Sequence, residues 1–210
     1  NGVNYTKKDG TFGAFNCGTV ATAYSAKCGT VFFATEKTVY SANDGTINEI
    51  QTFDTNICDI SGQDTVYLLA EDGLFKYENG IFERFFHNGS DSRCLACSNK
   101  KITAANNRSL NIVNGKRKHW MSIFPEHSTM PEIKINAIAF DNIGYLWVGA
   151  DEGLFIYDYK SGWYSHKQIP VLPEEKVYAI TFTAEGNAFV GTEAGAVLIS
   201  MGGAKYLPAM

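Results

Sequence analysis

Acidic side chains recur at equivalent places along the 210-residue chain. Each place is a short turn between two apolar runs, and the six carboxylates are those of Glu36, Glu71, Asp72, Asp151, Glu152 and Glu193. Carboxylates gathered on one surface create a negative field that attracts a cation or a basic protein patch. Acidic residues are also common in turns for purely local reasons, so a structural role is the alternative.

Histidine and cysteine could supply catalytic or metal-binding groups. The four histidines, His87, His119, His127 and His166, are not interleaved with carboxylates at metal-ligand spacing. Cys94 and Cys97 form a Cys-x-x-Cys pair, but residues three apart in a strand point to opposite faces, so we expect buried thiols there. Motifs for a serine nucleophile, a zinc protease or a phosphate loop do not occur in the sequence. The sequence therefore predicts neither a cofactor nor a metal ion.

The chain has five cysteines, so at least one thiol has no partner within the chain. Cys17 and Cys28 bracket a short alternating stretch and the turn that follows it. We expect a disulfide between these two residues at the end of a hairpin.

The composition limits the classes of partner. Hydrophobic residues make up 45% of the chain and charged residues 19%, which is typical of a folded protein. The net charge of −4 argues against a nucleic-acid partner, because phosphate neutralisation needs clustered Lys and Arg. No apolar run approaches the roughly 18 residues that a membrane span requires, so we expect no span in this segment.

Turn dipeptides repeat along the chain at regular intervals. The glycines of Asp9-Gly10, Asp44-Gly45, Asn79-Gly80 and Asn114-Gly115 are each 35 residues apart, and Gly162 and Gly203 follow at 47 and 41. Asp-Gly and Asn-Gly tolerate positive φ at both centres of a two-residue hairpin turn. Each pair therefore predicts one hairpin per repeat.

Each repeat has four apolar stretches, and the first alternates between polar and apolar residues. The opening stretches are residues 19–24, 56–60, 93–97, 135–140 and 177–182. A 3.6-residue apolar stripe is missing, so we expect almost no helix. Four short strands every 35 to 47 residues are typical of a β-propeller. A β-sandwich and a stacked-sheet solenoid are the alternatives, although a sandwich gives no reason for the repeat.

The predicted fold class is therefore all-β, a single propeller region of about five four-stranded antiparallel blades. The blades span residues 19–55, 56–92, 93–130, 131–173 and 174–210, and residues 1–18 form a half blade or closing strands. Two interpretations of this arrangement of five blades and a half blade stay open. Either the chain is a segment of a larger propeller, or the hairpin at Val3–Phe15 completes the last blade and closes a small ring.

Residues 135–158 and 177–200 resemble the two-component regulator propeller repeat. The first reads INAIAFDNIGYLWVGADEGLFIYD, and the second reads VYAITFTAEGNAFVGTEAGAVLIS, with Phe189 where the family prefers Trp. The resemblance implies that Trp147 packs between blades, that Asp141 and Gly144 form a turn, and that Gly149 and Gly153 permit close backbone approach. It also implies an extracellular or periplasmic location and a ligand-sensing role.

The leading hypothesis is a non-catalytic binding or sensing module. Its partner would be a protein or small molecule at the channel mouth, where the acidic turns of a propeller share one face. Another segment of the same protein could also be the partner. The alternatives are a structural scaffold or a propeller enzyme, such as a lyase or glycoside hydrolase. An enzyme would need convergent groups from several opening strands, and the candidates are Asp59, Arg93, Asn136 and Tyr178.

Overall fold

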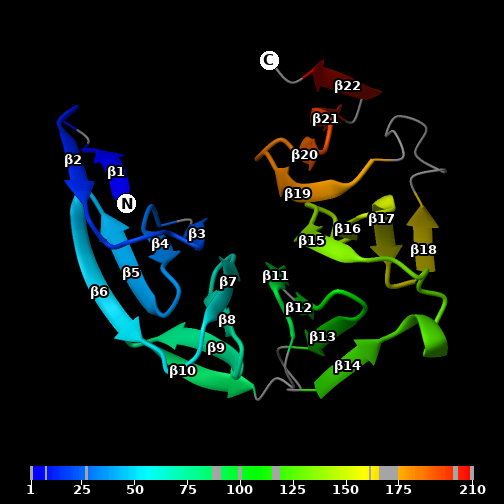
Figure 1. Ribbon diagram of the computed structural model, residues 1–210, viewed down its shortest axis with the longest axis horizontal. Helices are drawn as coiled ribbons and strands as arrows, with labels where there is room; N and C mark the ends of the chain where they lie inside the picture. The colour runs from blue at the N-terminus through cyan, green and yellow to red at the C-terminus, as the bar shows by residue number, and fades with distance from the viewer. Residues whose placement is uncertain are drawn as a thin grey trace. The chain divides into compact units, whose positions relative to one another are not determined.

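The fold is seen in a computed structural model (Figure 1). It describes residues 2–7, 9–26, 28–86, 91–98, 101–114, 119–160, 162–165, 175–200 and 203–208. The chain forms two compact units, Asn1–Asn99 and Lys100–Met210. Within the described residues, no helix has the length and apolar character needed to cross a membrane.

The first unit begins with a two-stranded half blade and continues with two complete blades. The half blade pairs β1 (Val3–Thr6) with β2 (Phe12–Phe15). Blade 1 contains β3 (Thr22–Ser25), β4 (Val31–Ala34), β5 (Thr38–Asn43) and β6 (Thr46–Thr52). Blade 2 contains β7 (Ile57–Gly62), β8 (Val66–Ala70), β9 (Gly73–Glu78) and β10 (Ile81–Phe86).

Three further blades follow, and the division between the two units falls inside the first of them. Blade 3 contains β11 (Cys94–Cys97), β12 (Lys101–Ala105), β13 (Leu110–Asn114) and β14 (His119–Ile123). Blade 4 contains β15 (Ile135–Phe140), β16 (Leu146–Ala150), β17 (Gly153–Asp158) and β18 (Gly162–Ser165). Blade 5 contains β19 (Val177–Phe182), β20 (Ala188–Thr192), β21 (Gly195–Ser200) and β22 (Gly203–Pro208).

The predicted fold class is confirmed, because the strands form five four-stranded antiparallel blades arranged as a β-propeller. In every blade the strands are hydrogen-bonded in sequence order. The strands of each blade are labelled in Figure 1. The opening strands lie where the alternating stretches predicted them, with the first displaced to Thr22–Ser25. The described part of the chain has only one short 3₁₀ turn, η1 (Pro125–His127).

The hairpin turns have the backbone geometry that the repeated dipeptides predict. Asp44 and Gly45 have φ values of 48° and 77°, and Asn79 and Gly80 have φ values of 53° and 89°. Positive φ at both central residues matches the right-handed twist of the strands that the turn joins. These turns therefore fix the register between the third and fourth strands of blades 1 and 2.

The predicted disulfide is wrong, because Cys17 and Cys28 are both free thiols. Cys17 precedes β3 and Cys28 follows it, so the strand holds the two residues at opposite ends. The Cys28 thiol instead lies 3.5 Å from the Thr30 hydroxyl oxygen. Proximity in sequence was misleading because an extended strand separates its ends by about 3.3 Å per residue.

Aromatic side chains fill the space between the blades of the first unit. Phe32 of blade 1 makes edge-on contacts with Tyr77 and Phe82 of blade 2, with ring centroids 5.0 and 6.3 Å apart. The half blade is attached in the same way, since Phe15 packs 5.4 Å from the ring of Tyr40. The core of this unit therefore lies between sheets, as stacked blades require.

Blades 4 and 5 pack through the residues that the family resemblance singled out. Trp147 makes an edge-on contact with Phe182 of blade 5, with centroids 5.3 Å apart, and donates from Nε1 to Asp141 Oδ2 at 3.0 Å. Asp141 Oδ1 accepts the backbone N–H of Gly144 at 2.8 Å, which forms the turn before β16. A Cβ on Gly149 would lie only 2.5 Å from the Val177 side chain. The expected structural roles of Trp147, Asp141, Gly144 and Gly149 are confirmed.

Candidate functional site

The six acidic residues lie in turns that join the second and third strands of their blades. Glu36 lies between β4 and β5, Glu71 and Asp72 between β8 and β9, Asp151 and Glu152 between β16 and β17, and Glu193 between β20 and β21. We call these turns, together with residues 106–109 between β12 and β13, the rim turns.

Main-chain hydrogen bonds attach each acidic turn to the start of an opening strand. Within a blade, the N–H groups of Glu71, Asp151 and Glu193 donate to the carbonyls of Asn56, Lys134 and Lys176, at 3.0 to 3.1 Å. Between blades, the Ile57 N–H donates to the Glu36 carbonyl at 2.7 Å, and the Ile135 N–H donates to the Asn107 carbonyl at 3.0 Å. Neighbouring rim turns within a unit therefore lie at the same end of their sheets, next to the starts of the opening strands.

Two rim carboxylates of blade 2 hold the connection that precedes β7. Glu71 accepts hydrogen bonds from the Asn56 side-chain amide at 3.1 Å and from the Asn56 N–H at 3.3 Å. Asp72 accepts from the Thr55 hydroxyl at 2.7 Å and pairs with the Arg84 guanidinium. Partial burial acts to raise the pKa of Asp72, but the bonds from Arg84 and Thr55 outweigh it, and the pKa is lowered.

The corresponding pair in blade 4 has the same kind of partners. Asp151 accepts from the Asn136 amide at 2.9 Å and lies 3.3 Å from the Lys134 ammonium, so its pKa is lowered, mainly by the Asn136 bond. Asn136 also donates to the Val177 carbonyl at 3.2 Å, which ties blade 4 to blade 5. Glu152 Oε2 accepts the Lys134 N–H at 2.9 Å. Four of the six carboxylates therefore bind residues at or just before the start of an opening strand, and two of them, Glu71 and Glu152, accept backbone N–H groups there.

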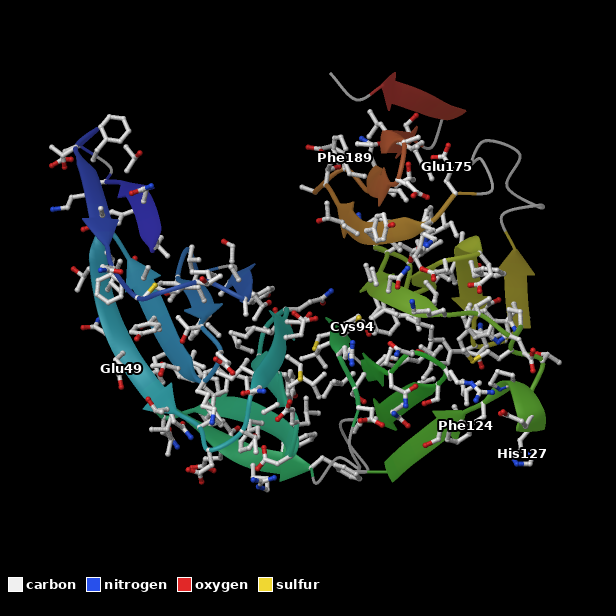
Figure 2. The ribbon with its side chains drawn as sticks, in the orientation of Figure 1. Glu49, Cys94, Phe124, His127, Glu175 and Phe189 are labelled. Carbon is white, nitrogen blue, oxygen red and sulfur yellow. The ribbon has the colours of Figure 1, made fainter. Side chains whose placement is uncertain are left out.

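An open pocket of about 450 Å³ lies among the rim turns of the second unit. It is lined by Asn107, Arg108, Pro125, Glu132, Ile133, Lys134 and Glu152. These residues come from the β12–β13 turn, the connection between blades 3 and 4, and the β16–β17 turn. The side chains of Phe124 and His127 lie on the same connection (Figure 2). Of the lining residues, the sequence singled out Glu152 for binding. The others lie on the β12–β13 turn or on the connection between blades 3 and 4, which has no repeat signature.

The four residues considered for catalysis lie on or beside opening strands, and two have structural partners. Asp59 is partly buried and accepts bonds from the Thr22 hydroxyl at 2.9 Å and the Leu95 N–H at 2.8 Å. It thereby links blades 1, 2 and 3, and burial raises its pKa. Asn136 bridges blades 4 and 5 as described, Tyr178 is 52% exposed on β19, and Arg93 is exposed just before β11.

The cysteines next to Asp59 are protonated thiols at neutral pH. Burial raises the pKa of Cys58 to about 11 and those of Cys94 and Cys97 to about 12. Cys94 lies on β11 (Figure 2) and is partly buried, whereas Cys97 is buried. Buried protonated thiols are poor nucleophiles and poor metal ligands.

The histidines do not form a metal site in the described part of the chain. His127 lies in η1, His119 is described through its backbone alone, and His87 and His166 lie outside the described residues. Among the described residues, no group of three or more His, Cys, Asp or Glu side chains could hold a metal ion.

Comparison with known proteins supports the fold. No family model matches the chain, and no curated protein matches its sequence. Among solved structures, an extracellular domain of the hybrid two-component system BT4673 from B. thetaiotaomicron has a TM-score of 0.70 and 17% identity over 91% of this chain and 28% of its own. Virginiamycin B lyase from Staphylococcus aureus has a TM-score of 0.76 and 14% identity over 100% of this chain and 78% of its own.

A third similar structure is YCF48 bound to D1 peptide, with a TM-score of 0.64 and 11% identity over 90% of this chain and 67% of its own. The chain spans less than a third of the two BT4673 extracellular domains that it matches. These identities show a shared β-propeller fold. The same fold occurs in an extracellular domain of a two-component system, in a lyase and in a protein bound to a peptide, so the fold alone does not assign a function.

Proposed function

We propose that the chain is a non-catalytic ligand- or protein-binding module that binds its partner at the rim turns. The observation that carries this proposal is the pocket of about 450 Å³ beside Glu152. Turns and connections form its walls, while the strands behind them are held by main-chain hydrogen bonds. Variable segments on a rigid scaffold are the common location of binding sites.

The proposed partner is basic, as the acidic rim turns favour a cation or a positively charged protein patch. Glu36, Glu71, Glu152 and Glu193 are exposed, so their charges reach the solvent. Each contributes little alone because salt screens exposed charges. The summed field acts mainly on the rate of encounter.

A sensing role and an extracellular or periplasmic location belong to the same proposal. The repeat of residues 135–158 resembles the two-component regulator propeller repeat. The B. thetaiotaomicron structures BT4673 and BT3049 are extracellular domains of such signalling systems and share the fold. Together these resemblances support membership of the same broad group of propellers.

The second candidate function is a lyase, favoured by the similarity to virginiamycin B lyase. The proposed binding role has more support because two of the four candidate catalytic side chains have structural roles. Asp59 joins three blades and Asn136 joins two. A lyase would give substrate turnover that is lost on replacing Tyr178 or Arg93, whereas a binding module gives saturable binding without turnover.

The proposed binding face is tested by cross-linking. A hexalysine peptide is coupled to the chain with a carbodiimide at low ionic strength, and the linked carboxylates are located by mass spectrometry. We expect coupling at Glu36, Glu71, Glu152 and Glu193 well above that at the exposed Glu83 and Glu185, which lie away from the rim turns. Equal coupling at all exposed glutamates would reject the proposal.

A further inference from the structure

We propose that the pocket beside Glu152 binds a lysine side chain of a peptide or protein. This inference rests on the proposed binding function and names its ligand class. The pocket lies within the second unit. It is lined by residues of blades 3 and 4 and of the connection between them. Its volume of about 450 Å³ lies within the usual range for small-ligand sites, about 300 to 1,000 Å³.

The basic side chains of the pocket already have acidic partners. Arg108 lies 3.0 Å from Glu126, and the Lys134 ammonium lies 3.3 Å from Asp151. An anionic ligand would have to break one of these ion pairs in order to bind. The pocket walls therefore do not favour a phosphate or carboxylate ligand.

The acidic side chains of the pocket can accept further hydrogen bonds from a ligand. Glu152 uses Oε2 to accept the Lys134 N–H at 2.9 Å, which orients the carboxylate and leaves Oε1 for a further donor. Glu132 is exposed and makes no ion pair with any residue that the structure describes. Two carboxylates in one concave site focus a negative field on a ligand cation.

The remaining lining residues favour an organic cation over a metal ion as the ligand. Ile133 and Pro125 give the pocket an apolar wall next to the carboxylates. A lysine side chain matches both features, because its methylene stem packs on apolar surface while its ammonium supplies three donors. Three acidic or imidazole ligands for a metal ion do not meet here among the described side chains.

The test compares the pentapeptide Ac-Ala-Ala-Lys-Ala-Ala-NH₂ with the same peptide carrying norleucine, which is apolar and of similar length. Binding is followed by shifts of backbone amide NMR signals. We expect saturable shifts at Arg108, Ile133, Lys134 and Glu152 with the lysine peptide and none with the norleucine peptide. Equal shifts with both peptides would show that the carboxylates do not select the ligand, and the inference would fail.

The double variant Glu132→Gln/Glu152→Gln tests the carboxylates directly. The glutamine that replaces Glu152 retains a carbonyl oxygen that accepts the Lys134 N–H, so the fold is expected to persist, which an unchanged amide spectrum would confirm. We expect about a tenfold loss of affinity for the lysine peptide, a typical effect of removing a charged partner. The matched control, Glu83→Gln/Glu185→Gln, makes the same change in net charge away from the pocket and is expected to bind normally.

The outcomes separate this inference from the proposed function. If the lysine peptide binds but the pocket variant retains full affinity, the pocket inference is wrong while binding at another rim turn still stands. If the lysine peptide does not bind at millimolar concentration, the inference is also overturned. Cross-linking of hexalysine to the rim turns would then decide the proposed function by itself.

Discussion

Asp59 is a partly buried carboxylate that connects three blades through hydrogen bonds from Thr22, Ile60 and Leu95. Burial raises its pKa above the ordinary value of 3.8, so folding favours the protonated form. Its contribution to the free energy of unfolding is therefore greatest below pH 3.8 and is lost as the pH rises through the raised pKa. This carboxyl group thus has a structural role with a predictable pH dependence.

Replacing Asp59 with Asn should remove that pH dependence. We expect the variant to lose about 1 to 3 kcal/mol near pH 4, because the amide cannot accept both backbone N–H bonds. The loss should become smaller as the pH rises and the wild-type carboxyl ionises. Urea unfolding of both proteins between pH 4 and pH 7 measures this difference. A difference that grows with pH would show that the hydrogen bonds dominate and that the pKa is lowered instead.

Trp147 tests the contact between blades 4 and 5 at a single residue. Replacement by Ala removes the contact with Phe182 and the bond to Asp141, so we expect a loss of about 3 kcal/mol in the free energy of unfolding. Replacement by Phe retains a ring and should cost about 1 kcal/mol, mainly from the lost hydrogen bond. Chemical denaturation gives both values. A loss below about 1 kcal/mol for Ala would contradict the packing role.

At the scale of elements, equivalent strands of blades 4 and 5 have different surroundings. On β16, Trp147 packs against Phe182 of the next blade, and Gly149 lies against Val177. The equivalent residues on β20 are Phe189, labelled in Figure 2, and Gly191. Phe189 is 37% exposed, and a Cβ on Gly191 would meet its nearest described neighbour, Ala179, at 3.5 Å. The same sequence position is therefore tightly packed in one blade and open in the other.

Two glycine substitutions measure this difference. Gly149→Ala places a Cβ 2.5 Å from the Val177 side chain and should cost about 1 to 3 kcal/mol through overpacking. Gly191→Ala makes an ordinary contact at 3.5 Å and should be neutral or slightly stabilising, since Ala restricts the unfolded chain. Thermal and urea unfolding of both variants provide the comparison. Equal destabilisation by the two changes would show that both faces are packed alike.

At the scale of the whole molecule, the repeat was predictable because its signals are local. Residues 135–140 and 177–182 alternate clearly and became β15 and β19 with the expected bounds. The first opening strand was displaced to Thr22–Ser25, where alternation of small and polar residues marks the bounds poorly. The disulfide prediction failed because Cys17 and Cys28, although close in the sequence, lie at opposite ends of an extended strand.

The proposed binding site was less predictable, because the contacts of its acidic residues join segments that are apart in the sequence. The acidic turns were visible in the sequence, but the bonds from Asn56 to Glu71 and from Asn136 to Asp151 join residues 15 apart. The sequence signal that could have revealed these two bonds was the Asn near the start of each of the two opening strands, Asn56 and Asn136. Glu132 and Arg108 were missed because the packing of a connection against a turn is decided in three dimensions.

Association kinetics test the central claim, that a basic partner binds at the rim turns. The variant Glu36→Gln/Glu71→Gln/Glu152→Gln/Glu193→Gln leaves Asp72 and Asp151 to hold their blades. The control variant Glu49→Gln/Glu78→Gln/Glu83→Gln/Glu185→Gln makes the same change in net charge at exposed positions elsewhere.

The measurement is the association rate constant of hexalysine with each immobilised protein at low and at physiological ionic strength. The account predicts a severalfold slower association for the rim variant at low ionic strength, little change for the control, and convergence of all three proteins as salt is added. Equal slowing of the rim and control variants would contradict it, because net charge rather than the rim turns would then govern the encounter.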